Sequence, residues 1–326
     1  MTTVYLVGHI NKLKVRMDAN IINCFDYVID KSTCCVKYCE INYIQNLKYD
    51  TDAIFILLPN AFDKETTSES KDIIKNMTNG KCLFFEDLKC KCGYKCDGTN
   101  TDCEWNKWYN ENIVPYNFNC LISRYRSYIP LALELKHRVH YFPHLLNINI
   151  FDRKDTKEVD ILFYGNHQPD FYPFRHRLYF ILKNKNNNKL KDLRVRIIDH
   201  PGWGPKSKRR GCVGQKLYTE INNAWLTVCT KAIHNALLAK YIETVMGGSV
   251  ILGDYPDIDD CFRDNMVYIH NDMTDDDIMD KIIDSINDKT TLNKFIYNNN
   301  AIAHRFSLEA CINIFDSIVG SISDGK

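Results

Sequence analysis

The chain has 326 residues, of which 45% are hydrophobic and 12% aromatic, and its 42 Lys and Arg residues balance 41 Asp and Glu to a formal net charge of +1. This length favours two globular domains of about 150 residues each, and the balanced charge argues against a dedicated nucleic-acid-binding protein. The N-terminus has no basic region before its short apolar run, and no stretch reaches the ~18–20 apolar residues of a membrane span, so we expect a soluble cytoplasmic protein.

Short apolar runs alternate with polar or helical connections in the first part of the chain. The expected strands are Val4–Val7, Cys24–Asp30, Ala53–Leu58, Lys81–Phe85, Leu121–Ser123 and His140–Phe142, with a helix at Lys71–Met77. Strands that are buried in a parallel sheet read as continuous apolar runs. The pattern therefore predicts an α/β domain over residues 1–150, with a parallel sheet between helices.

His9 directly follows the first expected strand and so lies at the carboxyl edge of the predicted sheet. An imidazole can take the proton of a hydroxyl group near neutral pH, which makes His9 a candidate general base. The alternative is a loop histidine that only caps or hydrogen-bonds locally. Asp18, Glu86 and Asp87 also lie near expected loop edges and are alternative bases.

A cysteine-rich insertion at residues 88–120 interrupts the pattern of strands. Its four central cysteines have the spacing C-x-C-x3-C-x6-C and are Cys90, Cys92, Cys96 and Cys103, with Cys82 and Cys120 nearby. Four thiolates can close a tetrahedral structural zinc site. Zinc knuckles more often use C-x2-C, so a surface insertion without metal is the alternative. In a cytosolic protein the 14 cysteines are expected to be thiols or metal ligands rather than disulfides.

A second α/β domain is expected over residues 151–326, after the charged stretch Asp152–Glu158. It begins with a strand at Ile161–Tyr164, which Gly165 and Asn166 follow as a turn at the carboxyl edge. Arg175 lies in the next helix, just after Pro173, where a guanidinium can pair with phosphate oxygens. Val195–Ile198 is a further strand, and the Gly- and Pro-rich loop that starts at His200 carries Trp203.

Residues 223–256 read as a strand, a helix and a second strand, which is the βαβ unit of a parallel sheet. Trp225–Cys229 and Ser249–Leu252 are the strands, and the helix between them is expected at Asn235–Met246. Thr230, Lys231 and His234 precede this helix at the carboxyl edge, where helix N-termini favour anions.

The helix of this unit carries Lys240 and Glu243 and ends at Gly247 and Gly248. A carboxylate at Glu243 can accept hydrogen bonds from a ribose diol, and the two glycines would let a ligand approach the backbone. The alternative is a solvated helix residue followed by a helix stop signal. Further along, Thr274 is expected to cap a helix at Ile278–Ile286, and Leu308–Ile318 forms the last amphipathic helix.

Three segments resemble glycosyltransferases of the GT-B fold, most closely the group 1 and spore-maturation-protein-like members. They are Val139–Asn147, Asp160–Leu178 and Ala239–Asp254, and they occur in the family's order within residues 139–315. Ala-Lys-Tyr-Ile-Glu-Thr-Val-Met-Gly-Gly-Ser-Val-Ile-Leu-Gly-Asp is similar to the family's donor-binding segment and places its glutamate at Glu243. Many retaining members have a second glutamate eight residues earlier, where this chain has Asn235.

The resemblance implies a fold of two Rossmann-like domains with a cleft between them. The N-terminal domain would bind the acceptor and the C-terminal domain a nucleotide-sugar donor, with the last helix crossing back onto the first domain. It implies a glycosyltransferase that needs no metal for catalysis and acts on a sugar, protein or small-molecule hydroxyl. A nucleotide-sugar epimerase and a non-catalytic nucleotide- or glycan-binding protein are the alternatives on the same fold.

Overall fold

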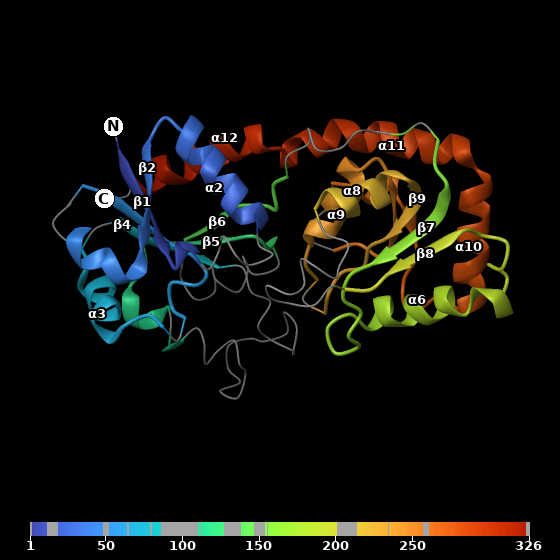
Figure 1. Cartoon of the computed structure of the whole chain (residues 1–326), viewed down its shortest axis with the longest axis horizontal. Coiled ribbons are helices and arrows are strands. Elements are labelled where there is room, and N and C mark those ends of the chain that lie inside the picture. The colour runs from blue at the N-terminus through green and yellow to red at the C-terminus, as the bar shows by residue number, and fades with distance from the viewer. Residues whose placement is uncertain are drawn as a thin grey trace. The chain divides into compact units, whose positions relative to one another are not determined.

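The computed structural model describes most of the chain, which divides into two compact units (Figure 1). The described residues are 2–11, 19–47, 52–63, 65–78, 80–85, 110–111, 113–126, 138–146, 154, 156–200, 214–233, 235–256 and 261–323. Unit 1 combines Met1–Leu145 with Leu308–Lys326, and unit 2 is Leu146–Ser307. The chain therefore passes from one unit to the other twice.

The described part of unit 1 contains a six-stranded sheet in the order β2-β1-β3-β4-β5-β6, in which every pair of neighbours is parallel. Its strands are β1 (Thr3–Gly8), β2 (Cys35–Glu40), β3 (Ile54–Leu57), β4 (Gly80–Phe85), β5 (Cys120–Ser123) and β6 (Val139–Tyr141). β3 and β5 are buried at every residue, as expected for strands that are covered on both faces.

In the described part of unit 1 the assigned helices are α2 (Ala19–Lys31), α3 (Ser68–Asn76) and α12 (Leu308–Ser323), with 3₁₀ turns η1 (Ile41–Leu47) and η3 (Val114–Tyr116). Figure 1 shows α12 beside α2, and both helices contribute to one core with the sheet. On α12, Cys311, Phe315 and Ile318 recur at spacings of three and four residues, which gives a continuous apolar stripe. The last helix of the chain thus completes the core of the first unit.

The expected strand at Cys24–Asp30 is wrong, because this segment lies within helix α2. Cys24, Phe25 and Val28 are buried while Asp26 and Asp30 face outward, which is helical spacing rather than alternation. The strand between β1 and β3 in the sequence is instead β2, which contains Cys35 and Cys39 and pairs with β1.

The described part of unit 2 contains a five-stranded parallel sheet in the order β11-β10-β9-β7-β8. Its strands are β7 (Val159–Tyr164), β8 (Val195–Ile198), β9 (Ala224–Val228), β10 (Val250–Gly253) and β11 (Val267–Tyr268). Its helices are α6 (Pro173–Lys183), α8 (Gln215–Asn222), α9 (Ala239–Met246), α10 (Asp275–Asn287) and α11 (Lys289–Ala303), with 3₁₀ turns η6 (Lys185–Asn187), η7 (Arg263–Asn265) and η8 (His304–Phe306).

Alternate residues of each strand in unit 2 face opposite sides of the sheet. Ile161 and Phe163 of β7 pack with α6 and α10, whereas Leu162 and Tyr164 pack with α8. Ile251 of β10 packs with α9 on that second side. The prediction of parallel sheets with helices on both faces is therefore confirmed.

The central βαβ unit is present as predicted, but its helix starts at Ala239 rather than at Asn235. Asn235 has φ = 53°, a left-handed backbone conformation that cannot continue a right-handed helix. The predicted cap at Thr274 is confirmed, since its hydroxyl oxygen accepts the Asp277 N–H and the Asp277 carboxylate accepts the Thr274 N–H.

Candidate active site

Each sheet has one point where the chain reverses its direction of winding, and α/β folds bind ligands at the carboxyl ends of the strands beside that point. In unit 1 the chain goes from β1 to β2 on one side and then to β3 on the other. In unit 2 it goes from β7 to β8 and then to β9. The residues that follow β1, β3, β7 and β9 are therefore the first candidates for a site in each unit.

Glu243 and Tyr164 form a direct contact at the switch point of unit 2. Tyr164 is the last residue of β7, and its hydroxyl donates to Glu243 Oε2 at 2.8 Å. Burial raises the pKa of Glu243, while the hydrogen bond from Tyr164 and the charge of Lys240 oppose this rise. Burial and the neighbouring carboxylate hold the pKa of Tyr164 well above its usual value. The alternative interpretation of Glu243 as a solvated helix residue is therefore wrong. Its carboxylate is partly buried, and the hydrogen bond from Tyr164 fixes its orientation.

Lys240 adds a buried amine next to this pair. Its Nζ donates to the backbone oxygen of Tyr164 and lies 3.8 Å from the centre of the Tyr164 ring. Burial holds the pKa of Lys240 well below its usual value, and the charge of Arg175 lowers it further. A nearby anion would stabilise the charged form of this lysine.

Gly165 follows Tyr164 with φ = 89°, in the left-handed region that favours glycine. A Cβ atom there would lie 3.1 Å from Lys240 Nζ, which is a tight contact. The glycine therefore allows both the sharp turn after β7 and the position of the lysine.

Arg175 connects the loops that follow β7 and β9. Its Nε and Nη2 donate to Oγ1 and O of Thr230 at 3.0 and 2.7 Å, and its Nη1 donates to Asn166 O at 3.0 Å. The side chain is only 3% exposed and stacks against the Tyr172 ring at 4.2 Å. The structure thus brings Arg175, Asn166 and Thr230 together, and the guanidinium is already engaged in holding both loops.

Lys231 lies beside a buried carboxylate that the sequence analysis did not select. Its backbone N–H donates to Oδ1 of Asp254, the residue after β10, at 2.8 Å. Burial raises the pKa of Asp254 to about 6, although the hydrogen bond from Lys231 and the charges of Lys231 and Arg175 oppose the rise.

Gly247 and Gly248 lie at the opposite end of α9 from the switch point. Their N–H groups donate to Glu243 O and Val245 O and close the helix. Both are buried, and a Cβ at Gly247 would lie 2.4 Å from Ile221 Cγ2 of α8. The structure gives these glycines a role in helix termination and packing and does not bring them to the carboxyl edge.

His9 lies at the switch point of unit 1, with an exposed fraction of 6%. Its N–H donates to Asn60 Oδ1 at 3.2 Å, and the Asn60 amide donates back to His9 O at 2.9 Å. His9 Nε2 lies 3.0 Å from Thr66 Oγ1, whose own proton is donated to Ala61 O. Thr66 Oγ1 therefore accepts from Nε2–H, which assigns the proton to Nε2 and leaves Nδ1 as the basic nitrogen.

Several predicted residues lie outside the described residues. They are His234 of the candidate donor site, the cysteines Cys90, Cys92, Cys96 and Cys103, the alternative bases Asp18, Glu86 and Asp87, and Trp203. Among the residues that the structure does describe, no three His, Cys, Asp or Glu side chains are grouped so that they could hold a metal ion. Within the same ranges, no helix is long and apolar enough to cross a bilayer.

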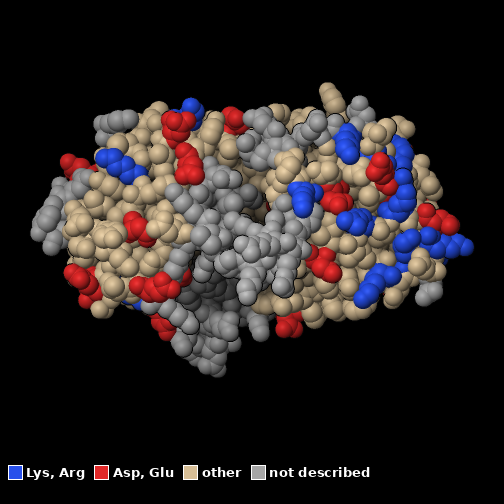
Figure 2. Space-filling model, viewed as in Figure 1, with Lys and Arg blue, Asp and Glu red and all other residues tan. Residues whose placement is uncertain are grey.

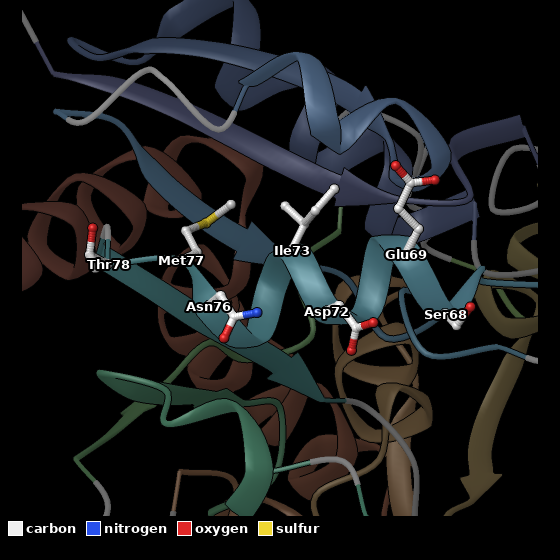
Figure 3. Close-up of a pocket in the computed structure, with 7 residues that line it drawn as sticks. All are labelled: Ser68, Glu69, Asp72, Ile73, Asn76, Met77 and Thr78. Atoms are coloured by element: carbon white, nitrogen blue, oxygen red, sulfur yellow. The ribbon is translucent and has the colours of Figure 1, made fainter.

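A pocket of about 490 Å³ lies in unit 1, and none of the predicted site residues is among those described as lining it. Its described lining comes from α3 and the turn after it (Figure 3): Ser68, Glu69, Asp72, Ile73, Asn76, Met77 and Thr78. On the surface of unit 2, basic side chains are gathered with acidic ones among them (Figure 2). Ion pairs such as Arg194–Asp160, at 3.0 Å, and Arg196–Glu220, at 3.1 Å, link charges of opposite sign in this unit.

Four residues that contact the candidate site residues were not predicted from the sequence, namely Asn60, Thr66, Tyr164 and Asp254. Tyr164 and Asp254 each stand at the carboxyl end of a predicted strand, which was the available signal. Asn60 and Thr66 follow β3, but their contact with His9 depends on β3 lying next to β1.

No protein-family model matches this sequence, and no curated protein matches it. Solved structures do share its fold. A sucrose-phosphate synthase from Thermosynechococcus elongatus aligns with a TM-score of 0.66 over 100% of both chains at 8% sequence identity. Anabaena HepE, solved with UDP and glucose, has a TM-score of 0.58 over 98% of this chain and 100% of its own at 9% identity. The pneumococcal O-GlcNAc transferase GtfA, solved with UDP and GlcNAc, has a TM-score of 0.55 over 86% of this chain and 59% of its own at 11% identity.

At these identities the likeness is one of fold. The expected fold of two Rossmann-like α/β domains, as in GT-B proteins, is therefore confirmed.

Proposed function

We propose that this chain is a glycosyltransferase that moves a sugar from a nucleotide-sugar donor to a hydroxyl group of a glycan, a protein or a small molecule. The observation that carries the proposal is the group formed by Glu243, Tyr164 and Lys240 at the switch point of unit 2. Structures that share the fold were solved with UDP and a sugar, which supports a nucleotide-sugar as the ligand.

The donor would bind to unit 2 through its ribose and its diphosphate. Tyr164 holds Glu243 by one carboxylate oxygen, Oε2, so Oε1 is available to accept from a ribose hydroxyl. Lys240 and Lys231 would lie near the diphosphate with His234, and Gly165 would let it approach the backbone. We propose that Arg175 contributes its charge while it holds the Asn166 and Thr230 loops, because three of its nitrogens already donate to them.

In the reaction, the bond between the anomeric carbon and the diphosphate oxygen breaks as the acceptor oxygen attacks that carbon. Fixed cations lower the barrier because they stabilise the negative charge that develops on the leaving diphosphate. We propose that Lys240 and Arg175 supply this charge without a metal ion. His9 Nδ1 would take the proton of the acceptor hydroxyl, since Thr66 fixes the proton of the imidazole on Nε2.

Thermal unfolding with UDP, GDP, ADP, TDP and CMP tests the donor site. A ligand at 100 times its Kd stabilises a protein by about 2.7 kcal/mol, which corresponds to a Tm rise of roughly 5–10 °C in a domain of about 160 residues. We expect one nucleotide to raise the Tm of the wild type and the Asp284→Ala control, whose exposed carboxylate lies on α10. Glu243→Ala should lose the shift. An equal shift in Glu243→Ala, or none in the wild type, would contradict the proposed site.

A further inference from the structure

Two cysteines that take no part in either candidate site contact each other in unit 1. Cys82 on β4 and Cys120 on β5 stand directly opposite each other in the parallel register. Their Sγ atoms are 2.9 Å apart, and the two residues are 0% and 1% exposed. They are separated by 38 positions in the sequence, so the contact depends on the fold.

The backbone geometry at this pair suits a disulfide. Neighbouring strands lie about 4.7–4.9 Å apart, which is inside the Cα separation of about 4.4–6.8 Å found for disulfides. The sulfur atoms would need to approach each other by about 0.9 Å to reach the bond length of about 2.05 Å. A movement of this size is available from small changes in the two side-chain torsions.

The surroundings of Cys120 favour its thiolate, which is the reactive form of a cysteine. The hydrogen bond with Cys82 lowers the pKa of Cys120, and His140 and Arg138 lower it as well, so that it is about 6 in spite of burial. Cys82 has the opposite environment, because its hydrogen bond with Cys120 and its burial hold its pKa well above the usual value. Arg138 lowers the pKa of both cysteines, whereas His140 lowers that of Cys120 alone, which makes Cys120 the better attacking sulfur and Cys82 the resolving one.

We propose that Cys82 and Cys120 are a peroxide-reactive pair that closes to a reversible disulfide in the folded protein. The Cys120 thiolate attacks one oxygen of hydrogen peroxide, the O–O bond breaks, and the released hydroxide takes a proton to become water. Cys82 then attacks the resulting Cys120 sulfenic acid, and the S–S bond forms as a second water leaves. Two thiols lose two electrons and one peroxide gains them.

Cys229 provides a matched control within the same chain. It is also 0% exposed, but its Sγ contacts Thr244 Oγ1 at 3.2 Å rather than a second thiol. Burial raises the pKa of Cys229 to about 11, so it stays protonated at neutral pH. Cys229 is therefore as deeply buried as Cys82 and Cys120. A difference in oxidation between Cys229 and the pair would reflect the partner thiol and the surrounding charges.

The test treats the full-length folded protein with hydrogen peroxide at neutral pH, quenches it in acid, blocks remaining thiols in denaturant and maps the peptides. We expect a joined peptide that contains Cys82 and Cys120 and disappears on reduction, while Cys229 remains blocked by the alkylating reagent. In Cys82→Ser, Cys120 should instead accumulate as a sulfenic acid that dimedone traps. In Cys120→Ser, Cys82 should not react at the same dose.

The wild-type map decides the question even where a variant fails to fold. Free thiols at both Cys82 and Cys120, under a dose that oxidises the chain elsewhere, would overturn the proposal. Cys82 or Cys120 joined mainly to other cysteines, or Cys229 oxidised as fast as Cys120, would overturn it too. None of these outcomes depends on the glycosyltransferase assignment.

Discussion

The hydroxyl of Tyr164 and the carboxylate of Glu243 are separated by 79 positions in the chain and meet only because β7 and α9 pack together. The phenol fixes one oxygen of a carboxylate whose pKa burial has raised. A carboxylate that is held in this way loses less side-chain entropy when a ligand binds. We therefore propose that the pair acts as one recognition element, in which Tyr164 affects binding through its contact with Glu243.

Tyr164→Phe should weaken nucleotide binding about 3–10-fold, because it removes one hydrogen bond that orients Glu243. Glu243→Ala should weaken binding more, about 10–100-fold, since it removes a charged hydrogen-bond acceptor. The double variant should lose no more than Glu243→Ala alone, because Tyr164 acts on the ligand through Glu243. Isothermal titration of the three variants measures this, and fully additive losses would show that the two side chains act separately.

Asp254 should make the stability of unit 2 depend on pH. Its pKa is raised from 3.8 to about 6 in the folded state, so the folded protein binds the proton more tightly than the unfolded chain. The stability that this proton confers is complete below pH ~4 and is lost as the pH rises through ~6, a change of about 3 kcal/mol.

Asp254→Asn keeps an oxygen that can accept from Lys231 N–H and removes the charge. The variant should therefore gain stability relative to the wild type between pH 4 and pH 7 in denaturant unfolding. A difference between the two proteins that stays constant over this range would show that Asp254 titrates normally.

At the scale of elements, the two sheets follow from continuous apolar runs, which is why nearly all the predicted strands were found. The exceptions have physical causes. The run at Cys24–Asp30 is apolar enough for a strand, but its polar residues recur at helical spacing in α2. The helix that carries Glu243 starts one turn later than expected, because Asn235 takes a left-handed conformation and Leu238, the N-cap residue, is extended, which the sequence does not reveal.

The candidate site could be predicted only in part, for a reason that also lies at this scale. His9, Gly165 and Thr230 were found because each follows a strand, and strand ends can be read from the sequence. The contacts of His9 with Thr66 and of Lys231 with Asp254 require the order of the strands, which local patterns do not contain. The expectation that Gly247 and Gly248 let a ligand approach rested on their place in the sequence motif, whereas in the structure both close α9 and Gly247 lies against Ile221 of α8.

Two Gly→Ala substitutions are expected to change the free energy of unfolding in opposite directions. Gly253 ends β10 with φ = 152°, and a Cβ there would lie 1.8 Å from Cys229 O, so Gly253→Ala should cost several kcal/mol. Gly320 is in α12 with no atom within 4 Å of an added Cβ, so Gly320→Ala should stabilise by about 0.5–1 kcal/mol. Urea unfolding compares them, and equal effects would contradict this reading of the two sites.

At the scale of the whole molecule, the chain has separate cores in its two units, although the last helix belongs to the first unit. Phe315 of α12 and Ile282 of α10 are each buried in one of these cores. Truncation of such a side chain to alanine costs about 2–5 kcal/mol. If the two units unfold in separate thermal transitions, Phe315→Ala and Ile282→Ala should each lower the Tm of a different transition.

Scanning calorimetry of the full chain measures this directly. Phe315→Ala should lower the transition of unit 1, and Ile282→Ala should lower that of unit 2. A nucleoside diphosphate that binds should raise only the transition that Ile282→Ala lowers, because the proposed donor-binding residues all lie in unit 2. If the nucleotide instead raises the Tm of the transition that Phe315→Ala lowers, its binding site lies in unit 1, and the proposed donor site in unit 2 is contradicted.

The central claim is that the chain transfers sugar from a nucleotide-sugar, and turnover of the donor tests it most directly. The nucleotide that raises the Tm of the protein identifies which nucleotide-sugars to test. Purified protein would be incubated with these nucleotide-sugars, and the products followed by proton NMR. The account predicts slow release of nucleoside diphosphate and free sugar to water, which Glu243→Ala abolishes and Asp284→Ala retains. Conversion into a second nucleotide-sugar without diphosphate release would indicate an epimerase, and an unchanged donor that nevertheless binds would indicate a non-catalytic protein. Either result would contradict the proposed function.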